Sequence, residues 1–295
     1  MPRTIALCTI VVFVAASAAA QGNSGAHGHA PEGGATAGAA GGATPLPGSG
    51  QSSRTFGVWL DDASVAAPGG GWATLSTGYY RADLFHEFDF PVADAGVGIS
   101  KGIQGGFSVP VYNVDPIGGT PAHGVGDVYL HGKVQLRDPV SSADGVGYAI
   151  VPIVEVSRNP LPGTSKVNWA VPVSVEMRRP GWRWYGSGGY FSRGSLFGSA
   201  AIERSLTKRL SVNGTFSDSF ATKTAPGEPT TLPRSRADIG GGASYAIRPS
   251  WIVFGAIGRT ISAHEPTSTN LAITGGVSLN LTAPKQTRTK KTSGQ

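Results

Sequence analysis

Residues 124–138, GVGDVYLHGKVQLRD, sort their side chains onto two faces with a period of two. One face carries Val128, Leu130, Val134 and Leu136, and the other carries Asp127, Tyr129, His131, Lys133 and Gln135. This alternation predicts a β-strand with one apolar and one polar face. In a transmembrane barrel, lipid would contact the Val and Leu side chains and a wet lumen would contact the polar ones. A soluble sheet, half buried against a core, would produce the same pattern, so both structures remain open.

The composition favours a β protein with little charge on its surface. The chain has 295 residues, 44 of them glycine, and only 14% are charged, whereas an ordinary soluble domain has about a quarter. The formal net charge is +6, and much of it lies in a basic tail, residues 283–295, which contains Lys285, Arg288, Lys290 and Lys291. We therefore predict no nucleic-acid-binding surface.

The amino-terminal residues predict export. Residues 1–20 combine Arg3, an apolar run and the small residues Ala18, Ala19 and Ala20, which is typical of a signal peptide cleaved near Ala20. The apolar run is too short for a spanning helix of about twenty residues, so a membrane-embedded mature chain would be a barrel. The single cysteine, Cys8, lies within this signal, so we expect no disulfide in the mature protein.

A Gly/Ala/His-rich segment, residues 21–53, follows the signal. Its composition cannot form a core, so we predict a disordered linker. Its two histidines, His27 and His29, are too few for a metal site. The ordered part begins near residue 54, and residues 54–62, RTFGVWLDD, are either a short leading strand or a plug against the barrel wall.

The remainder, up to residue 282, predicts an all-β, antiparallel transmembrane β-barrel of about twelve strands. We expect these strands near residues 72–82, 87–99, 103–114, 124–137, 146–157, 166–178, 182–193, 196–205, 208–221, 235–247, 250–262 and 270–282. Tight turns such as 101–102 alternate with longer connections such as 115–123, which predicts one rim of short turns and one of long loops. Aromatic residues near the predicted strand ends suggest an interfacial girdle, although they could also cap a soluble core. These are Trp72, Tyr79, Tyr80, Trp169, Trp182, Trp184 and Trp251.

Two stretches carry a family resemblance. Residues 93–113, ADAGVGISKGIQGGFSVPVYN, contain a strand, a tight turn and a second strand with Ser108-Val109-Pro110. Residues 124–136 then supply Gly124, Gly126, Asp127 and Lys133. Together they resemble the outer-membrane β-barrel family labelled "transporter" or "MetA-pathway of phenol degradation". The resemblance spans about residues 72–281. It implies a barrel of about a dozen strands embedded in outer-membrane lipid, which passes small and often hydrophobic molecules.

The predicted function is passive passage of small molecules through the lumen. Candidate pore-lining residues are Asp127, Tyr129, His131, Lys133, Glu155 and Glu176, whose opposite charges would set selectivity. We predict no enzyme, because none of His86, His123, His131 and His264 is followed two residues later by the serine found in barrels that resemble outer-membrane phospholipase. We also predict no cofactor and no metal, because the metal-ligand types at His86, Glu87 and Asp89 lack further partners at a defined spacing. The alternatives are a structural barrel without transport and a secreted soluble β-sandwich that binds a ligand or partner. Nothing in the sequence specifies an oligomeric state.

Overall fold

A computed structural model describes residues 60–157, 165–222, 235–262 and 268–281. The predicted signal peptide (1–20), linker (21–53) and basic tail (283–295) lie outside these residues. They therefore stay predictions. Within the described ranges there is no helix long and apolar enough to cross a membrane.

All described regular structure is β, in one antiparallel sheet of fifteen strands. The strands are β1 (Gly71–Arg81), β2 (Phe85–Ser100), β3 (Ile103–Pro116), β4 (Ala122–Val125), β5 (Val128–Arg137), β6 (Val146–Ile150), β7 (Ile153–Val156), β8 (Val167–Ala170), β9 (Val173–Arg179), β10 (Trp182–Phe191), β11 (Ser195–Ser205), β12 (Leu210–Ala221), β13 (Ser235–Arg248), β14 (Trp251–Ser262) and β15 (Leu271–Leu281).

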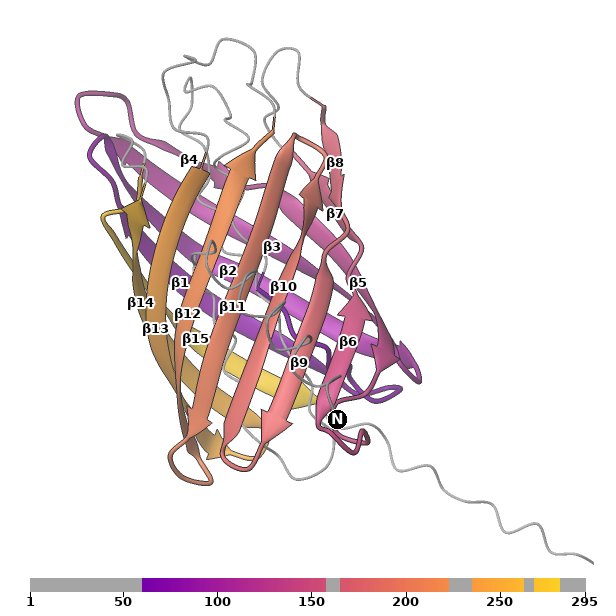
Figure 1. Ribbon diagram of the computed structural model, residues 1–295. Coiled ribbons are helices and arrows are strands. Elements are labelled where there is room, and N and C mark those ends of the chain that lie inside the picture. Colours follow the sequence, from indigo (N-terminus) through magenta and orange to yellow (C-terminus); the bar gives the residue numbers. More distant parts are fainter. Residues whose placement is uncertain (1–59, 158–164, 223–234, 263–267, 282–295) are drawn as a thin grey trace, which may run out of the picture.

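The sheet closes on itself as a barrel (Figure 1). Closure is made by β1 and β15, which pair from Gly71 opposite Leu281 to Arg81 opposite Leu271. At three positions in the wall, two short strands follow each other in line: β4 with β5, β6 with β7, and β8 with β9. Each of these pairs fills the place of one strand. The barrel therefore has twelve strands, as the sequence predicts.

Proline explains why the chain is broken into two short strands in two of these three in-line pairs. Pro152 separates β6 from β7, and Pro172 separates β8 from β9. Proline has no N–H to donate to a neighbouring strand, so the predicted continuous strands over 146–157 and 166–178 are each split. Their carbonyls still bind across the wall, since Gly132 N donates to Pro152 O and Val151 N donates to Pro172 O, over 2.8 and 2.9 Å.

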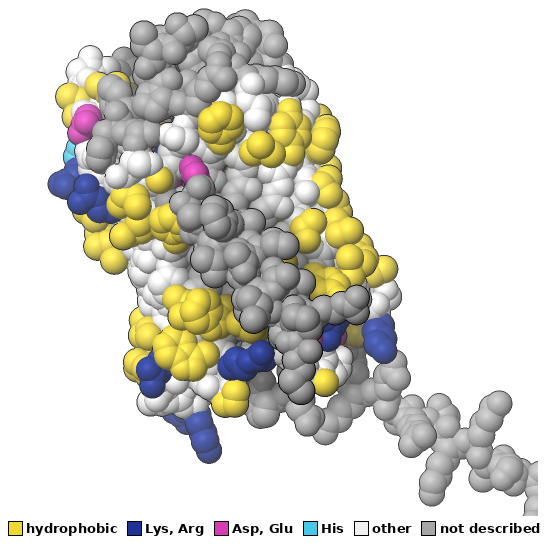
Figure 2. All heavy atoms as spheres, in the orientation of Figure 1, with side chains coloured by type: hydrophobic (Ala, Val, Ile, Leu, Met, Phe, Trp, Pro, Cys, Tyr) yellow, Lys and Arg dark blue, Asp and Glu magenta, His cyan; other side chains and the backbone are white. Residues whose placement is uncertain are grey.

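The two faces of the wall follow the predicted alternation. On β5, Leu130, Val134 and Leu136 are exposed on the outside while His131 and Lys133 are buried on the inside. Figure 2 shows hydrophobic side chains in several patches over the outside of the barrel, and many large apolar side chains are exposed there. So large an exposed apolar surface is unusual for a soluble protein and is the lipid-facing surface of a membrane barrel. The fold is therefore a transmembrane β-barrel.

The prediction of an aromatic girdle is correct for part of the set. Four tryptophans are exposed on the outer surface: Trp169, Trp182, Trp184 and Trp251. The prediction is wrong for Trp72 and Tyr80, which are buried inside the barrel. The reason is the register of β1, whose even-numbered residues face inward. Trp72 donates from Nε1 to Asp94 Oδ1 over 2.8 Å and packs on Ala66.

The two rims of the barrel differ. At the short-turn rim, consecutive strands are separated by short turns at residues 101–102, 180–181, 206–209 and 249–250. At the long-loop rim the connections include residues 117–121, 157–166 and 222–234. Three connections depart from the predicted scheme. The eight residues 138–145 join β5 and β6 at the short-turn rim, and the short turns 82–84 and 192–194 lie at the long-loop rim.

Candidate functional site in the barrel lumen

The chain enters the barrel before it joins the wall. Residues 60–68, here called the inner segment, precede β1, and their side chains are mostly buried. Leu60 packs against Tyr185 and Ala201 at one end, and Pro68 bridges to Gly98 at the other. Of the two structures left open for residues 54–62, the described part, 60–62, is therefore internal and is not a wall strand. Residues 54–59 lie outside the described ranges.

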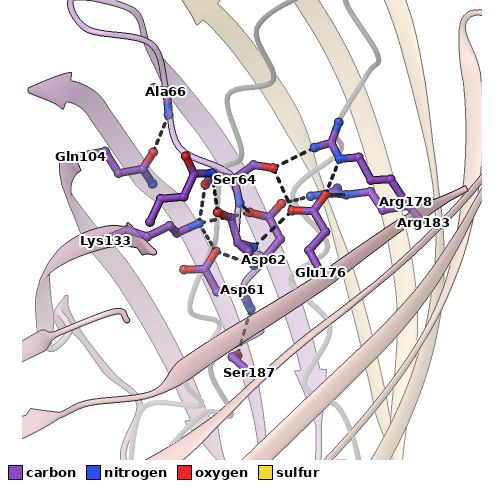
Figure 3. Close-up of polar contacts among 12 residues, drawn as sticks. Asp61, Asp62, Ser64, Ala66, Gln104, Lys133, Glu176, Arg178, Arg183 and Ser187 are labelled. Atoms are coloured by element: carbon purple, nitrogen blue, oxygen red, sulfur yellow. Dashed lines mark hydrogen bonds and ion pairs between the residues drawn. The ribbon is translucent and has the colours of Figure 1, made fainter. Parts of the chain in front are cut away.

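A buried lysine holds the acidic part of the inner segment (Figure 3). Lys133 Nζ lies 2.6 Å from Asp61 Oδ1, 3.1 Å from Asp62 Oδ1 and 3.0 Å from the carbonyl oxygen of Ser64. The lysine side chain is 1% exposed. A charge removed from water in this way is tolerated only where opposite charges and hydrogen bonds compensate its desolvation. The inner segment therefore compensates the buried charge of Lys133, and Lys133 in turn holds the inner segment inside the barrel.

Four wall residues extend this network: Glu176, Arg178, Arg183 and Glu203. Glu176 Oε1 accepts from Arg178 Nε over 2.6 Å and from Arg183 Nε over 2.7 Å. Its second oxygen, Oε2, accepts from Ser64 Oγ over 2.8 Å and from the backbone N–H of Ala63 over 3.2 Å. Arg183 also pairs with Asp62 and with Glu203 of β11. The inner segment is thus bound by ionic groups from β5, β9 and β10.

The backbone of the inner segment is bound as well. Ala66 N donates to Gln104 Oε1 over 2.8 Å, and Gln135 Nε2 donates to the Ala63 carbonyl over 2.8 Å. Asp61 N donates to Ser187 Oγ over 3.1 Å. A buried backbone outside any sheet needs such partners for its N–H and C=O groups. The wall supplies them at these three points, so the segment is held at defined positions inside the barrel.

A second ionic cluster lies nearer the long-loop rim. Arg193, in the turn between β10 and β11, has its guanidinium 2.7 Å from Glu155 Oε1 and 3.3 Å from Asp127 Oδ2. It also hydrogen bonds to Ser157. The Tyr129 hydroxyl donates to Glu155 Oε1 over 3.4 Å. The cluster joins β5, β7 and the β10–β11 turn across the inside of the wall.

All six predicted pore-lining side chains lie on the inner side of the wall, but they do not form one site. Lys133 and Glu176 contact the inner segment. Asp127, Tyr129 and Glu155 belong to the Arg193 cluster. His131 lies on the inward face of β5 between the two groups, with its ring centroid 6.4 Å from that of Trp72.

Sequence reasoning missed several residues of these clusters: Asp61, Asp62, Arg178, Arg183 and Arg193. The alternation of β10 could have identified Arg183, which shares a face with Tyr185 and Ser187. No comparable pattern marks residues 60–62. Within the described residues there is no group of three His, Cys, Asp or Glu side chains that could hold a metal ion. The ion pairs and hydrogen bonds around Lys133 and Glu176 join the inner segment to the wall, and those of Arg193 join neighbouring parts of the wall.

No protein-family model and no curated protein matches this sequence. Solved structures do match it. One is the COG4313 outer membrane channel from Pseudomonas putida F1, with a TM-score of 0.60 and 10% identity over 75% of this chain and 98% of that one. Another is the NanC porin, with a TM-score of 0.53 and 9% identity over 71% of this chain and 100% of that one. At such low identity the likeness shows the fold, which is that of outer-membrane channel barrels.

Proposed function

We propose that this protein is an outer-membrane channel for the passive passage of small molecules, and that the inner segment closes its lumen in the state described here. The observation that carries the proposal is the inner segment itself, which is docked inside a closed barrel through ion pairs and hydrogen bonds. Such contacts can be exchanged for water more readily than a packed apolar core. A channel with a removable closure would need this kind of contact.

The nature of the interior supports a channel over a soluble β-sandwich. A sandwich buries apolar side chains between two sheets. Among the described residues of this barrel, buried polar and charged side chains outnumber buried apolar ones, while many Val, Leu and Ile side chains and four tryptophans are exposed on the outer face. That distribution is typical of a membrane barrel with a wet interior. It also favours polar solutes over the hydrophobic ones that the family resemblance implies.

In this proposal the six predicted residues border the path of the solute. Asp127, Tyr129, His131 and Glu155 line its part nearer the long-loop rim, while Lys133 and Glu176 border the place where the inner segment lies. Location in the outer membrane is supported by the apolar outer wall and by the similar solved barrels. The predicted signal peptide, with cleavage near Ala20, would provide export.

The proposal is tested with purified full-length protein. Migration in SDS gels before and after boiling establishes that the barrel is folded. Conductance in planar lipid bilayers is then compared between the wild type and the double variant Asp61→Asn/Asp62→Asn, which removes the carboxylates that bind Lys133. We expect rare, small openings in the wild type and openings at least several-fold more frequent in the variant.

The matched control is Asp144→Asn, which removes one carboxylate from an exposed turn and should behave as the wild type. If folded wild type and folded double variant both fail to conduct, the barrel is a structural one and the proposed channel function is wrong.

A further inference from the structure

Basic side chains gather on one part of the short-turn rim, between β9 and β14. Five of them are exposed there, and we call them the basic arc: Arg179, Arg204, Lys208, Arg209 and Arg248. The acidic residues described at this rim on the same strands, Glu176 and Glu203, are buried on the inward face. Figure 2 shows Lys and Arg side chains beside hydrophobic ones near the lower end of the barrel. The outside of these strands therefore has a concentrated positive charge at this rim.

The cations of the basic arc differ from those inside the barrel, because they lack acidic partners. Inside, Lys133 and Arg183 pair with carboxylates. Within the described part of the chain, no residue of the basic arc forms an ion pair. The nearby turn 138–145 has two carboxylates, but Asp144 pairs with Arg137 over 2.8 Å and Asp138 accepts from two backbone N–H groups of its own turn. The positive charge of the arc is thus left for a partner outside the chain.

Aromatic side chains lie beside these cations on the outer face. Trp182 is the cross-strand partner of Arg179 on β9 and of Arg204 on β11. The guanidinium carbon of Arg204 lies 4.8 Å from the centroid of the Trp182 ring. Trp251 is likewise the cross-strand partner of Arg248. Both tryptophans are exposed, and exposed tryptophans of membrane proteins prefer the boundary between hydrocarbon and headgroups. The register therefore places these three arginines at the depth of the lipid headgroups.

The position of the basic arc and its chemistry specify the same partner. The arc borders the apolar outer wall, so the molecules next to it are lipids. An arginine can lay its apolar stem along hydrocarbon and keep its guanidinium at the polar boundary, where the planar set of N–H donors matches phosphate oxygens. Arg179 and Arg204 flank Trp182 at two strand spacings, about 10 Å, so they can contact neighbouring headgroups. A zwitterionic headgroup would add a positive charge to those already present. A phospholipid of net negative charge therefore fits best.

We propose that the basic arc binds the phosphate groups of anionic phospholipids and retains these lipids beside β9–β14 at the short-turn rim. The site lies on the outside of the wall, so the inference rests on the membrane fold and is independent of the proposed channel function.

The test measures lipid binding by the folded full-length protein in detergent. The temperature at which its migration in SDS gels changes is recorded with increasing dioleoyl phosphatidylglycerol. Dioleoyl phosphatidylcholine, which has the same acyl chains, and sodium phosphate are the comparisons. A ligand that binds only the folded state raises this temperature in a saturable way. We expect such a rise with phosphatidylglycerol, little or none with the comparisons, and a smaller rise at high salt, because salt screens exposed charges.

The test variant is Arg204→Gln/Arg248→Gln. Neither side chain forms an ion pair within the described residues, so the wall should stay folded, as its gel shift would show. We expect an apparent affinity for phosphatidylglycerol about tenfold weaker or more. The matched control is Arg81→Gln/Arg259→Gln, which removes two exposed arginines from the outer face near the long-loop rim and should bind as the wild type does.

Three results would overturn the inference: an equal rise with phosphatidylcholine, an equal rise with sodium phosphate, or unaltered affinity in the folded test variant. Binding of phosphatidylglycerol to a barrel that never conducts would sustain this inference and refute the proposed channel. The two proposals can therefore fail separately.

Discussion

At the scale of single residues, Lys133 is an inward-facing charge that binds another segment of the same chain. The period-two pattern correctly places Lys133 on the polar face of its strand. In the folded barrel its ammonium contacts Asp61, Asp62 and the Ser64 carbonyl. A fully buried lysine would be costly without these partners, because the desolvation of an ammonium amounts to several kcal/mol. The residue is therefore a fastening point for the inner segment.

Lys133→Met should release the inner segment while it leaves the wall intact. Methionine keeps the apolar stem but removes the charge, and Asp61 and Asp62 lose a buried partner, a change that costs ~3–5 kcal/mol. We expect a several-fold rise in bilayer conductance with an unchanged heat-dependent gel shift. Lys101→Met, in the exposed turn between β2 and β3, controls for the loss of one positive charge. Unaltered conductance in folded Lys133→Met would show that this lysine does not hold the closure.

At the scale of elements, the wall and the inner segment differ in what stabilises them. Each wall strand is joined to two neighbours by backbone hydrogen bonds, as β1 is to β2 and β15. The inner segment has no such ladder along the part of the chain described between residues 60 and 67. It relies on side chains from the wall, such as Gln104, Gln135 and Glu176. Local opening should therefore begin in the inner segment.

Thiol labelling can follow that opening. Ala63 is completely buried and Ala67 is exposed, and the only native cysteine, Cys8, lies in the predicted signal peptide. A membrane-impermeant maleimide should therefore label Ala67→Cys at least tenfold faster than Ala63→Cys. Adding Lys133→Met to Ala63→Cys should remove most of that difference. Equal labelling rates of the two single variants would show that the inner segment does not occupy the lumen in solution.

At the scale of the whole molecule, closure of the barrel depends on the seam between β1 and β15. Gly276 in β15 faces inward at this seam, opposite Ser76. A Cβ at Gly276 would lie 2.6 Å from the Leu75 carbonyl oxygen and 2.7 Å from Ser76 Cβ. These contacts are closer than real Cβ atoms allow, and the backbone cannot yield without disturbing the seam.

Gly276→Val should therefore destabilise the closed barrel by ~1–3 kcal/mol or more, the usual cost of overpacking. We expect the temperature of the heat-dependent gel shift to fall by several degrees and the yield of folded protein to drop. Gly255→Ala on β14 is the comparison, because its added Cβ would lie 3.6 Å from the nearest atom, an ordinary contact. A shift temperature equal to that of the wild type would mean that the seam is looser than described.

The wall could be predicted from the sequence because its physics is local. Alternate residues of a strand in a membrane barrel face lipid and lumen. The sequence of residues 128–137 therefore predicts both the strand conformation and the face that each side chain occupies, without knowledge of the neighbouring strands. The number of strands follows in the same way. Misplacement of Trp72 and Tyr80 shows the limit of this reasoning, since position near a strand end does not say which face a ring occupies.

Only the tertiary structure shows where the inner segment lies and which residues form the two ionic clusters. Asp61 meets Lys133 across 72 positions of sequence and Ser187 across 126, and neither separation leaves a pattern that a single sequence displays. The period-two alternation determined which residues enter the lumen. Only closure of the barrel determined which charges meet there, because long-range ion pairs depend on the spatial order of strands and on the path of the segment that precedes them.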